Sequence, residues 1–175
     1  MRKKIILFIV LICVFSLLSY LGYNVISKAK EKNQIAKQLE IIPEFEFFTL
    51  EQQPFTKANL KPSTNSIFIY FNSECDFCQH EAQSISDNLD SFKNVQFIFV
   101  STEPIAIIKQ FSEQYNLNNK QNITFLYDNF STFSSQFDAN SIPYLLIYDQ
   151  NQKLIKKYKG QLNANGILRA LQQND

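Results

Sequence analysis

The sequence contains no tryptophan, one histidine and one methionine, and its 175 residues include only three glycines, five prolines and three cysteines. So little glycine and proline excludes a collagen-like or low-complexity chain. Three cysteines are too few for a small domain held together by disulfides. The 17 basic and 16 acidic residues occur in mixed order and leave a net charge of +1, so no nucleic-acid or polyanion surface is expected. A hydrophobic content of 45% suffices for one globular domain with additional segments.

The N-terminal segment differs in composition from the rest of the chain. Three basic residues, Arg2, Lys3 and Lys4, precede an uncharged apolar run over residues 5–26, which is long enough to cross a bilayer as a helix. The run is longer than the apolar part of a typical signal peptide and no A-x-A-like cleavage site follows it, so residues 1–26 are predicted to be a retained membrane anchor. Positive charge before the span predicts a cytoplasmic N-terminus and a domain on the extracytoplasmic, periplasmic side.

The chain beyond the anchor divides into a stalk and a domain. Residues 27–42 are charged, with Ile35, Leu39 and Ile42 at helical spacing, which predicts a short stalk helix. Residues 43–175 form the predicted domain, in which strands and helices alternate. Strands are expected at 44–50, 66–71, 95–101, 123–127, 144–149 and 154–158, helices at 75–89, 104–115, 131–137 and after 163, and a turn and loop at 52–60. This order favours a mixed β-sheet covered by helices on both faces.

Two cysteines stand at the junction between the strand at 66–71 and the helix that follows it. Cys75 and Cys78 are three positions apart, so their sulfurs can close a small disulfide ring and reopen it. The unpaired N–H groups and the dipole of a helix start favour an anion, so a thiolate at Cys75 is stabilised there and becomes a nucleophile. The pair therefore indicates thiol–disulfide exchange.

The same pair fits metal or haem binding less well. A structural zinc site takes four ligands, and the other candidates are Cys13, inside the predicted anchor, and His80. Covalent haem attachment takes Cys-x-x-Cys-His, whereas Gln79 separates Cys78 from His80. No metal and no other cofactor is therefore expected.

Two stretches of the domain carry a family resemblance. FIYFNSECDFCQHEA holds the dithiol, and SIPYLLIYDQNQKLIKKYKGQLNANGILRAL follows it with an Ile-Pro pair, two strands joined by a turn, a glycine and a closing helix. In this order they resemble the thioredoxin fold, and the anchored chain is most similar to the membrane-tethered TlpA/ResA-type thiol–disulfide oxidoreductases of the redoxin superfamily. The resemblance implies a thioredoxin-like, three-layer α/β fold with a mixed central β-sheet flanked by helices, preceded by an N-terminal transmembrane helix.

The resemblance also implies a role for each residue of the dithiol. Cys75 attacks a substrate disulfide, and Cys78 then attacks Cys75, which releases the reduced substrate and closes the Cys75–Cys78 disulfide. Glu81 matches a family glutamate that lies beneath the dithiol and accepts the Cys78 proton. That role depends on burial, because a glutamate on the helix surface has no raised proton affinity to offer.

Substrate contacts are expected on both sides of the sulfurs. Pro143 matches the family's cis-proline, whose geometry exposes the backbone of Ile142 to an incoming chain. Asp76 and Phe77, between the two cysteines, are expected to contact the same substrate. The implied partners are protein disulfides, either in cytochrome c maturation or in other extracytoplasmic thiol proteins, and a membrane-embedded electron donor. The protein is expected to be a monomer that binds no nucleic acid.

Three other functions are also compatible with the sequence. A thiol peroxidase of the related family would use Thr-x-x-Cys with a nearby arginine, whereas Asn72 occupies the threonine position and the two arginines are Arg2 and Arg169. A soft-metal chaperone would bind copper through the two thiolates. A membrane-held adaptor domain would retain the dithiol without using it.

Overall fold

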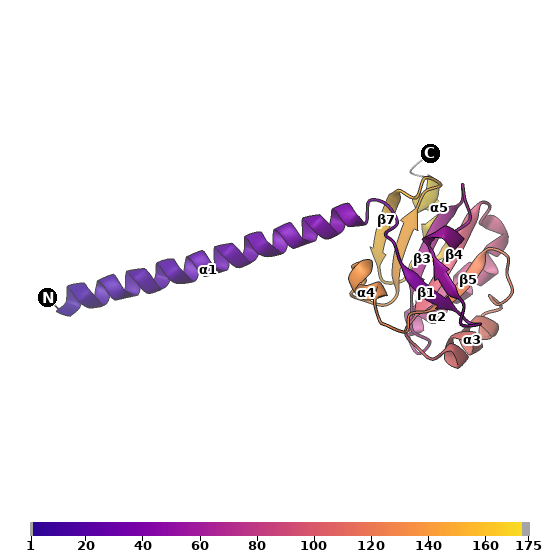
Figure 1. The fold of residues 1–175 in the computed structure, drawn as a ribbon, viewed down its shortest axis with the longest axis horizontal. Coiled ribbons are helices and arrows are strands. Elements are labelled where there is room, and N and C mark those ends of the chain that lie inside the picture. The colour runs from indigo at the N-terminus through magenta and orange to yellow at the C-terminus, as the bar shows by residue number, and fades with distance from the viewer. Residues whose placement is uncertain (1, 173–175) are drawn as a thin grey trace. The chain divides into compact units, whose positions relative to one another are not determined.

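The computed structural model describes residues 2–172, with side chains from residue 16 onward except that of residue 31. The chain forms two units, Met1–Gln38 and Leu39–Asp175. The first unit contains one continuous helix, α1 (Arg2–Gln38), which includes residues 2–26 of the predicted anchor and residues 27–38 of the predicted stalk (Figure 1). Within the part of the chain that the structure describes, no helix combines the length and hydropathy needed to span a membrane. Residues 5–15 of the predicted anchor, Cys13 included, lie outside the described side chains.

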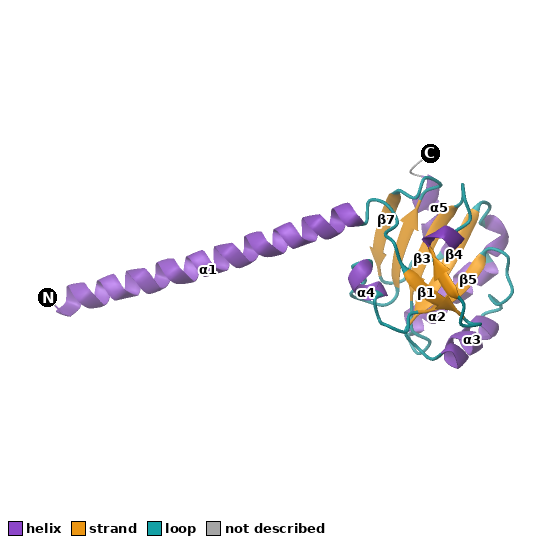
Figure 2. Cartoon of the chain, viewed as in Figure 1, coloured by secondary structure: helices purple, strands orange, loops and turns teal. Residues whose placement is uncertain are grey.

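The second unit is built on a mixed seven-stranded β-sheet (Figures 1 and 2). Its elements are β1 (Glu46–Thr49), β2 (Pro54–Thr56), β3 (Asn65–Tyr70), α2 (Asp76–Asp87), β4 (Val95–Ser101), α3 (Ile105–Gln114), β5 (Ile123–Tyr127), α4 (Phe133–Gln136), β6 (Tyr144–Tyr148), β7 (Leu154–Lys159) and α5 (Ala164–Gln172). The strand order is β2-β1-β5-β4-β3-β6-β7, in which β3, β4 and β5 run parallel and the other neighbours are antiparallel. The predicted mixed sheet flanked by helices is confirmed.

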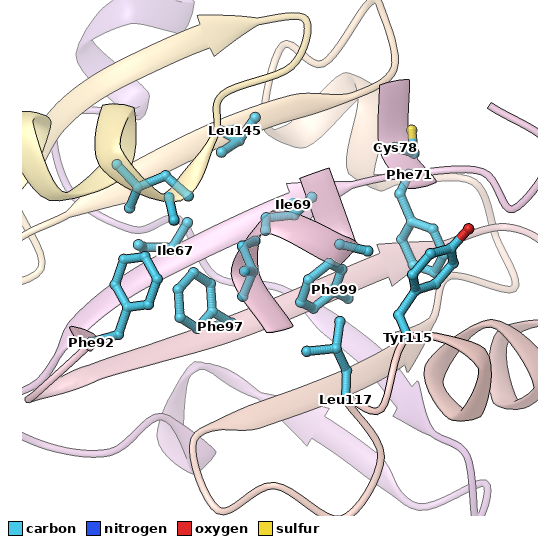
Figure 3. Close-up of a cluster of buried hydrophobic side chains, with 14 of the residues drawn as sticks. Ile67, Ile69, Phe71, Cys78, Phe92, Phe97, Phe99, Tyr115, Leu117 and Leu145 are labelled. Atoms are coloured by element: carbon cyan, nitrogen blue, oxygen red, sulfur yellow. The ribbon is translucent and has the colours of Figure 1, made fainter. Parts of the chain in front are cut away.

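One face of the sheet packs against α2, α3 and α5 and contains the main apolar core. Ile67, Ile69 and Phe71 point to this face because successive residues of a strand alternate between the two faces. They belong to the same buried cluster as Cys78 of α2. Figure 3 shows Phe71 and Cys78 at one end of this cluster and Phe92 at the other. The dithiol helix is therefore packed directly on the core of the domain.

The opposite face of the sheet carries an aromatic layer. Phe68 of β3 packs against Phe137, the C-cap residue of α4, with ring centroids 5.2 Å apart, and Phe47 of β1 packs against Phe133 of α4 at 5.8 Å. The rings of Phe133 and Phe137 stack on each other at 4.4 Å. All four side chains are buried. The rings of Phe133 and Phe137 therefore attach the one-turn helix α4 to this face of the sheet.

The domain begins before the predicted boundary at residue 43. Leu39 and Ile42, which the periodicity assigned to the stalk, are buried in the second unit. The β6–β7 hairpin holds their segment, because Ile42 N–H donates to Gln152 O at 3.1 Å and Leu154 N–H donates to Glu40 O at 2.9 Å. α1 ends at Gln38, so Leu39 and Ile42 lie beyond the helix that their spacing predicted, and tertiary contacts decide where the domain starts.

Residues 52–60, predicted to be a turn and loop, contain the strand β2. It pairs antiparallel with β1, with Phe55 opposite Phe47, and forms the edge of the sheet. Pro54 is tolerated because it is the first residue of an edge strand, where its missing N–H costs no ladder hydrogen bond. Three residues that begin with proline are too few to show the alternation that identifies a strand.

Candidate dithiol active site

The turn that joins β3 to α2 places Cys75 at the helix start. Cys75 N–H donates to Asn72 O at 3.2 Å and closes the turn, and Gln79 N–H donates to Cys75 O at 3.0 Å and begins the helical pattern. Cys75 is the N-cap residue of α2 and is half-buried. Its sulfur therefore lies where the unpaired N–H groups of the first helical turn favour an anion.

Cys78 lies one helical turn deeper and is 2% exposed. Both cysteines are free thiols in the structure. Burial raises the pKa of the Cys78 thiol far above its ordinary value, and the neighbouring Cys75 and Glu81 raise it further, against a hydrogen bond from the Asn72 backbone that lowers it. The buried thiol therefore keeps its proton at neutral pH. For Cys78 to act as a nucleophile, a base must take that proton.

Glu81 follows Cys78 on the same face of α2 and is fully buried. Its Oε1 accepts the Leu162 backbone N–H at 2.9 Å. Its Oε2 is buried and has no hydrogen-bond partner among the described residues. Burial raises the pKa of Glu81 to about 8, although the Leu162 hydrogen bond lowers it. The structure thus supplies the burial on which the predicted role of Glu81 depends.

The Ile142–Pro143 peptide bond is cis, as the resemblance implied. Pro143 is buried and its carbonyl accepts the Gly160 N–H at 2.9 Å, whereas Ile142 is 41% exposed. β6 begins at the next residue, Tyr144, which is paired with Tyr70 at the end of β3. The Ile-Pro loop and the dithiol turn therefore lie at the same edge of the sheet.

The two residues between the cysteines face solvent. Asp76 is exposed, and Phe77 is 62% exposed although it is a large apolar side chain. An exposed phenylalanine beside a reactive sulfur offers apolar contact area to a docking protein. His80, which follows them on α2, is also exposed.

The dithiol turn is held by a carboxylate that was not predicted from the sequence. Glu103, in the loop between β4 and α3, accepts the Ser73 backbone N–H at 2.7 Å and the Ser73 hydroxyl at 2.6 Å. The signal was available, because an acidic residue just after the strand next to β3 lies at the edge of the sheet where the dithiol turn begins. Its partner could not be chosen without the fold.

The described residues offer few metal ligands near the two thiols. Among them, no group of three or more histidine, cysteine, aspartate or glutamate side chains is placed to hold a metal ion. Cys75 and Cys78 supply two sulfur donors, which is fewer than a closed structural zinc site requires.

This fold and its paired cysteines define a thioredoxin-like thiol–disulfide oxidoreductase. Comparison with solved structures gives DsbF of Mycobacterium tuberculosis, 19% identical, covering 79% of this chain and 97% of that chain with a TM-score of 0.65. StoA from Bacillus subtilis is 14% identical, over 75% of this chain and 98% of that chain, with a TM-score of 0.59. The peroxidoxin BcpB from Mycobacterium tuberculosis is 16% identical, over 77% and 96%, with a TM-score of 0.65.

Sequence comparison assigns the family. The AhpC/TSA family model matches residues 39–171, and the chain belongs to this family. No curated protein matches the chain at a significant level. The predicted resemblance to thioredoxin-fold redoxins is confirmed, and the match begins at Leu39, where the second unit begins.

Proposed function

We propose that this protein reduces disulfides in other proteins through the Cys75–Cys78 dithiol while it is tethered to a membrane. One observation carries the proposal: Cys75 is accessible at a helix start, and Cys78 is buried one turn deeper beside a buried carboxyl. This asymmetry suits two sulfurs with different tasks.

In the first step, the Cys75 thiolate attacks one sulfur of a substrate disulfide. The substrate S–S bond breaks, a Cys75–substrate bond forms, and the second substrate sulfur leaves as a thiolate. The helix start favours this step because it stabilises the attacking anion. The partial exposure of Cys75 gives the substrate access to its sulfur.

In the second step, Cys78 attacks the Cys75 sulfur of the mixed disulfide. The Cys75–substrate bond breaks, the Cys75–Cys78 disulfide forms, and the substrate leaves fully reduced. Glu81 accepts the Cys78 proton, for which its raised pKa of about 8 gives it more affinity than an ordinary carboxylate has. A membrane-embedded electron donor then reduces the Cys75–Cys78 disulfide for the next cycle.

The exposed residues around the sulfurs form the docking surface. The backbone of Ile142, presented by the cis Pro143, pairs with an extended segment of the substrate, and Phe77 and Asp76 contact its side chains. The substrates are therefore proteins, such as apocytochromes in cytochrome c maturation or other extracytoplasmic thiol proteins.

The tether is the N-terminal segment. Residues 1–26 form a single-pass anchor, with Arg2, Lys3 and Lys4 on the cytoplasmic side and the domain on the extracytoplasmic, periplasmic side. The charge pattern and the length of the apolar run support this placement. A compartment in which disulfides form and exchange suits the chemistry of the dithiol. A cysteine accessibility assay on intact and permeabilised cells tests the side, and labelling of Cys75 only after permeabilisation would contradict it.

Trapping tests the exchange chemistry. A full chain with Cys78→Ala is expected to accumulate disulfide-linked protein adducts through Cys75, because the second step is blocked. Cys75→Ala is the matched control and should form none. The wild-type protein is expected to reduce insulin disulfides. The absence of adducts in Cys78→Ala, with no insulin reduction by the wild type, would contradict the proposed function and favour the adaptor domain.

A thiol peroxidase is the second candidate, favoured by the AhpC/TSA family and by the similarity to a peroxidoxin. Arg169, however, is exposed on α5, and Asn72 occupies the position of the peroxidase threonine. The rate constants for the reaction of reduced Cys75 with hydrogen peroxide and with a protein disulfide separate the two functions. A much faster reaction with peroxide would favour the peroxidase. Titration of the reduced domain with Cu(I) tests the metal chaperone.

A further inference from the structure

Ser73 is held from two directions immediately before the dithiol. Glu103 accepts the Ser73 backbone N–H through Oε2 at 2.7 Å and the Ser73 hydroxyl through Oε1 at 2.6 Å. The Ser73 carbonyl accepts the Gln79 side-chain amide at 2.8 Å. Both oxygens of one carboxylate thus bind one residue. A bidentate, charge-assisted contact of this kind fixes orientation as well as distance.

Ser73 is a central residue of the turn that leads to Cys75. The turn is closed by Cys75 N–H, which donates to Asn72 O at 3.2 Å, and Glu74 N–H donates to Asn72 Oδ1 at 2.9 Å. Each backbone N–H from Ser73 to Cys75 therefore has an acceptor within the protein. Rotation of the turn breaks at least one of these bonds, so they set the direction in which Cys75 enters α2.

Glu103 is itself positioned by the neighbouring strand. Ser101, the last residue of β4, is buried, and its hydroxyl donates to Glu103 Oε2 at 3.2 Å. Because β3 and β4 are parallel neighbours, their carboxyl ends lie at the same edge of the sheet. The carboxylate therefore bridges the end of β4 and the turn that follows β3. The negative charge of Glu103 by itself disfavours an anion nearby. Its hydrogen bonds, in contrast, hold the turn that directs Cys75 into α2.

We propose that Glu103 is a positioning residue for the attack by Cys75. It holds the turn so that the Cys75 sulfur approaches the incoming disulfide along the sulfur–sulfur axis. Glu103 acts through Ser73 and contacts neither the substrate nor the reacting sulfurs. The inference rests on the proposed function, because it concerns the first step of the same exchange.

The first step can be isolated in the full chain. With Cys13→Ser and Cys78→Ala, Cys75 is the only remaining thiol. When this parent reacts with the aromatic disulfide DTNB, Cys75 Sγ attacks one probe sulfur, the probe S–S bond breaks, and its electron pair leaves on a coloured aryl thiolate. The Cys75 proton goes to the solvent. One thiolate is released per mixed disulfide formed, and the reaction needs no other oxidant or reductant.

In this parent, Glu103→Ala is expected to slow the attack about tenfold, the change that corresponds to loss of a hydrogen bond to a charged group. Glu103→Gln keeps one acceptor and gives the Ser73 hydroxyl a donor, so it is expected to recover most of the rate although the charge is lost. Ser73→Ala removes one of the two bonds at constant charge and is expected to slow the attack about threefold. Glu113→Gln is the matched control, because its carboxylate is exposed on α3 and makes no hydrogen bond within the described residues, and it should leave the rate unchanged.

Two results overturn the proposal. If Glu103 acted only through its charge, Glu103→Ala and Glu103→Gln would react with DTNB at the same rate, and both would react faster than the parent. If Glu103 only stabilised the fold, Glu103→Ala would have a lower thermal stability, and the folded variant would react with DTNB at the rate of the parent. If Glu103→Ala does not fold, an unchanged rate in Ser73→Ala overturns the proposal instead. Failure of the exchange function itself is distinguishable, because Cys75 of the parent would then react no faster than a cysteine in a short peptide.

Discussion

Leu162 donates its backbone N–H to Glu81 Oε1 at 2.9 Å and so joins the dithiol helix to the loop before α5. A second bond in the same region, from Ala164 N–H to Ser84 Oγ at 3.0 Å, holds the same two segments together. Glu81 is thus enclosed, and water is excluded from a group that carries charge when it is ionised. The raised proton affinity of Glu81 follows from this enclosure.

The enclosure of Glu81 makes folding stability depend on pH. Its pKa rises from 4.5 to about 8 in the folded protein, so between these values the folded state retains a proton that the unfolded state releases. The stabilisation is full below the lower value and is lost as pH rises through the higher one. We expect the free energy of unfolding of the reduced protein to decrease by about 1.4 kcal/mol per pH unit in this window, and Glu81→Gln to remove the slope. Urea unfolding followed by circular dichroism at several pH values measures both.

The control for this measurement is Glu113→Gln, which makes the same chemical change at an exposed position. It should retain the slope of the wild type. If Glu81→Gln retains that slope as well, the carboxyl of Glu81 is not the group that titrates in this window.

Glu81→Gln should also slow the second step of exchange. An amide cannot accept the Cys78 proton, so the mixed disulfide should persist, with a loss of about a hundredfold in the rate of resolution. The wild-type rate should rise with pH up to about 8, as Glu81 ionises, and the variant should lack this rise. Rapid acid quenching followed by mass spectrometry measures the decay of the mixed disulfide. Attack of Cys75 on DTNB in the single-thiol parent should be unaffected by the substitution, and a slower attack there would argue against a role confined to Cys78.

Docking through Phe77 and Ile142 predicts an effect that depends on substrate size. Phe77→Ala and Ile142→Ala should each raise the KM for a protein disulfide about tenfold, because each removes exposed apolar contact area, and should leave the reduction of a small aliphatic disulfide unchanged. Steady-state kinetics with insulin and with hydroxyethyl disulfide compares the two substrates. Ile41→Ala is the matched control, because Ile41 is 51% exposed and pairs with Lys153. Lys153 lies in the turn between β6 and β7, at the end of β6 that is opposite to Ile142. Equal losses with both substrates would show that the two residues support the site rather than bind protein.

Tyr148 predicts a gain in stability. Its hydroxyl is buried and has no partner among the described residues, and burial, with a smaller contribution from Tyr144, raises its pKa. Its ring packs edge-on against Phe68 at 5.9 Å, a contact that phenylalanine retains. Tyr148→Phe should therefore increase the free energy of unfolding by about 1 kcal/mol, the cost of leaving a buried polar group unpaired. Chemical denaturation measures the change. A decrease instead would indicate that an internal water satisfies the hydroxyl.

Much of the domain could be predicted because its elements have strong local signals. β4 and β5 match the predicted ranges, since apolar runs of this length with bounding turns are typical of buried strands. Asn163, the residue after which the last helix was expected, caps α5, because Gly166 N–H donates to Asn163 Oδ1 at 2.9 Å. The Cys-x-x-Cys and Ile-Pro pairs were identifiable because their chemistry is carried by residue type.

The remaining features depend on contacts between distant parts of the chain. β2 has three residues and exists because β1 pairs with it, while Leu39 and Ile42 join the domain because the β6–β7 hairpin receives their segment. Ser73 and Glu103 are 30 positions apart, and only the parallel alignment of β3 and β4 brings them together.

Local order in the chain was sufficient to indicate a dithiol, to place it at the start of a helix and to show which family the domain resembles. These features depend on residue type and spacing, which can be read directly from the sequence. The tertiary structure alone decided that Glu81 is buried and that Glu103 holds the turn before Cys75. Burial and hydrogen bonding between distant segments follow from how strands align and helices pack, so the proton affinity of Glu81 and the orientation of the Cys75 turn are properties of the folded domain.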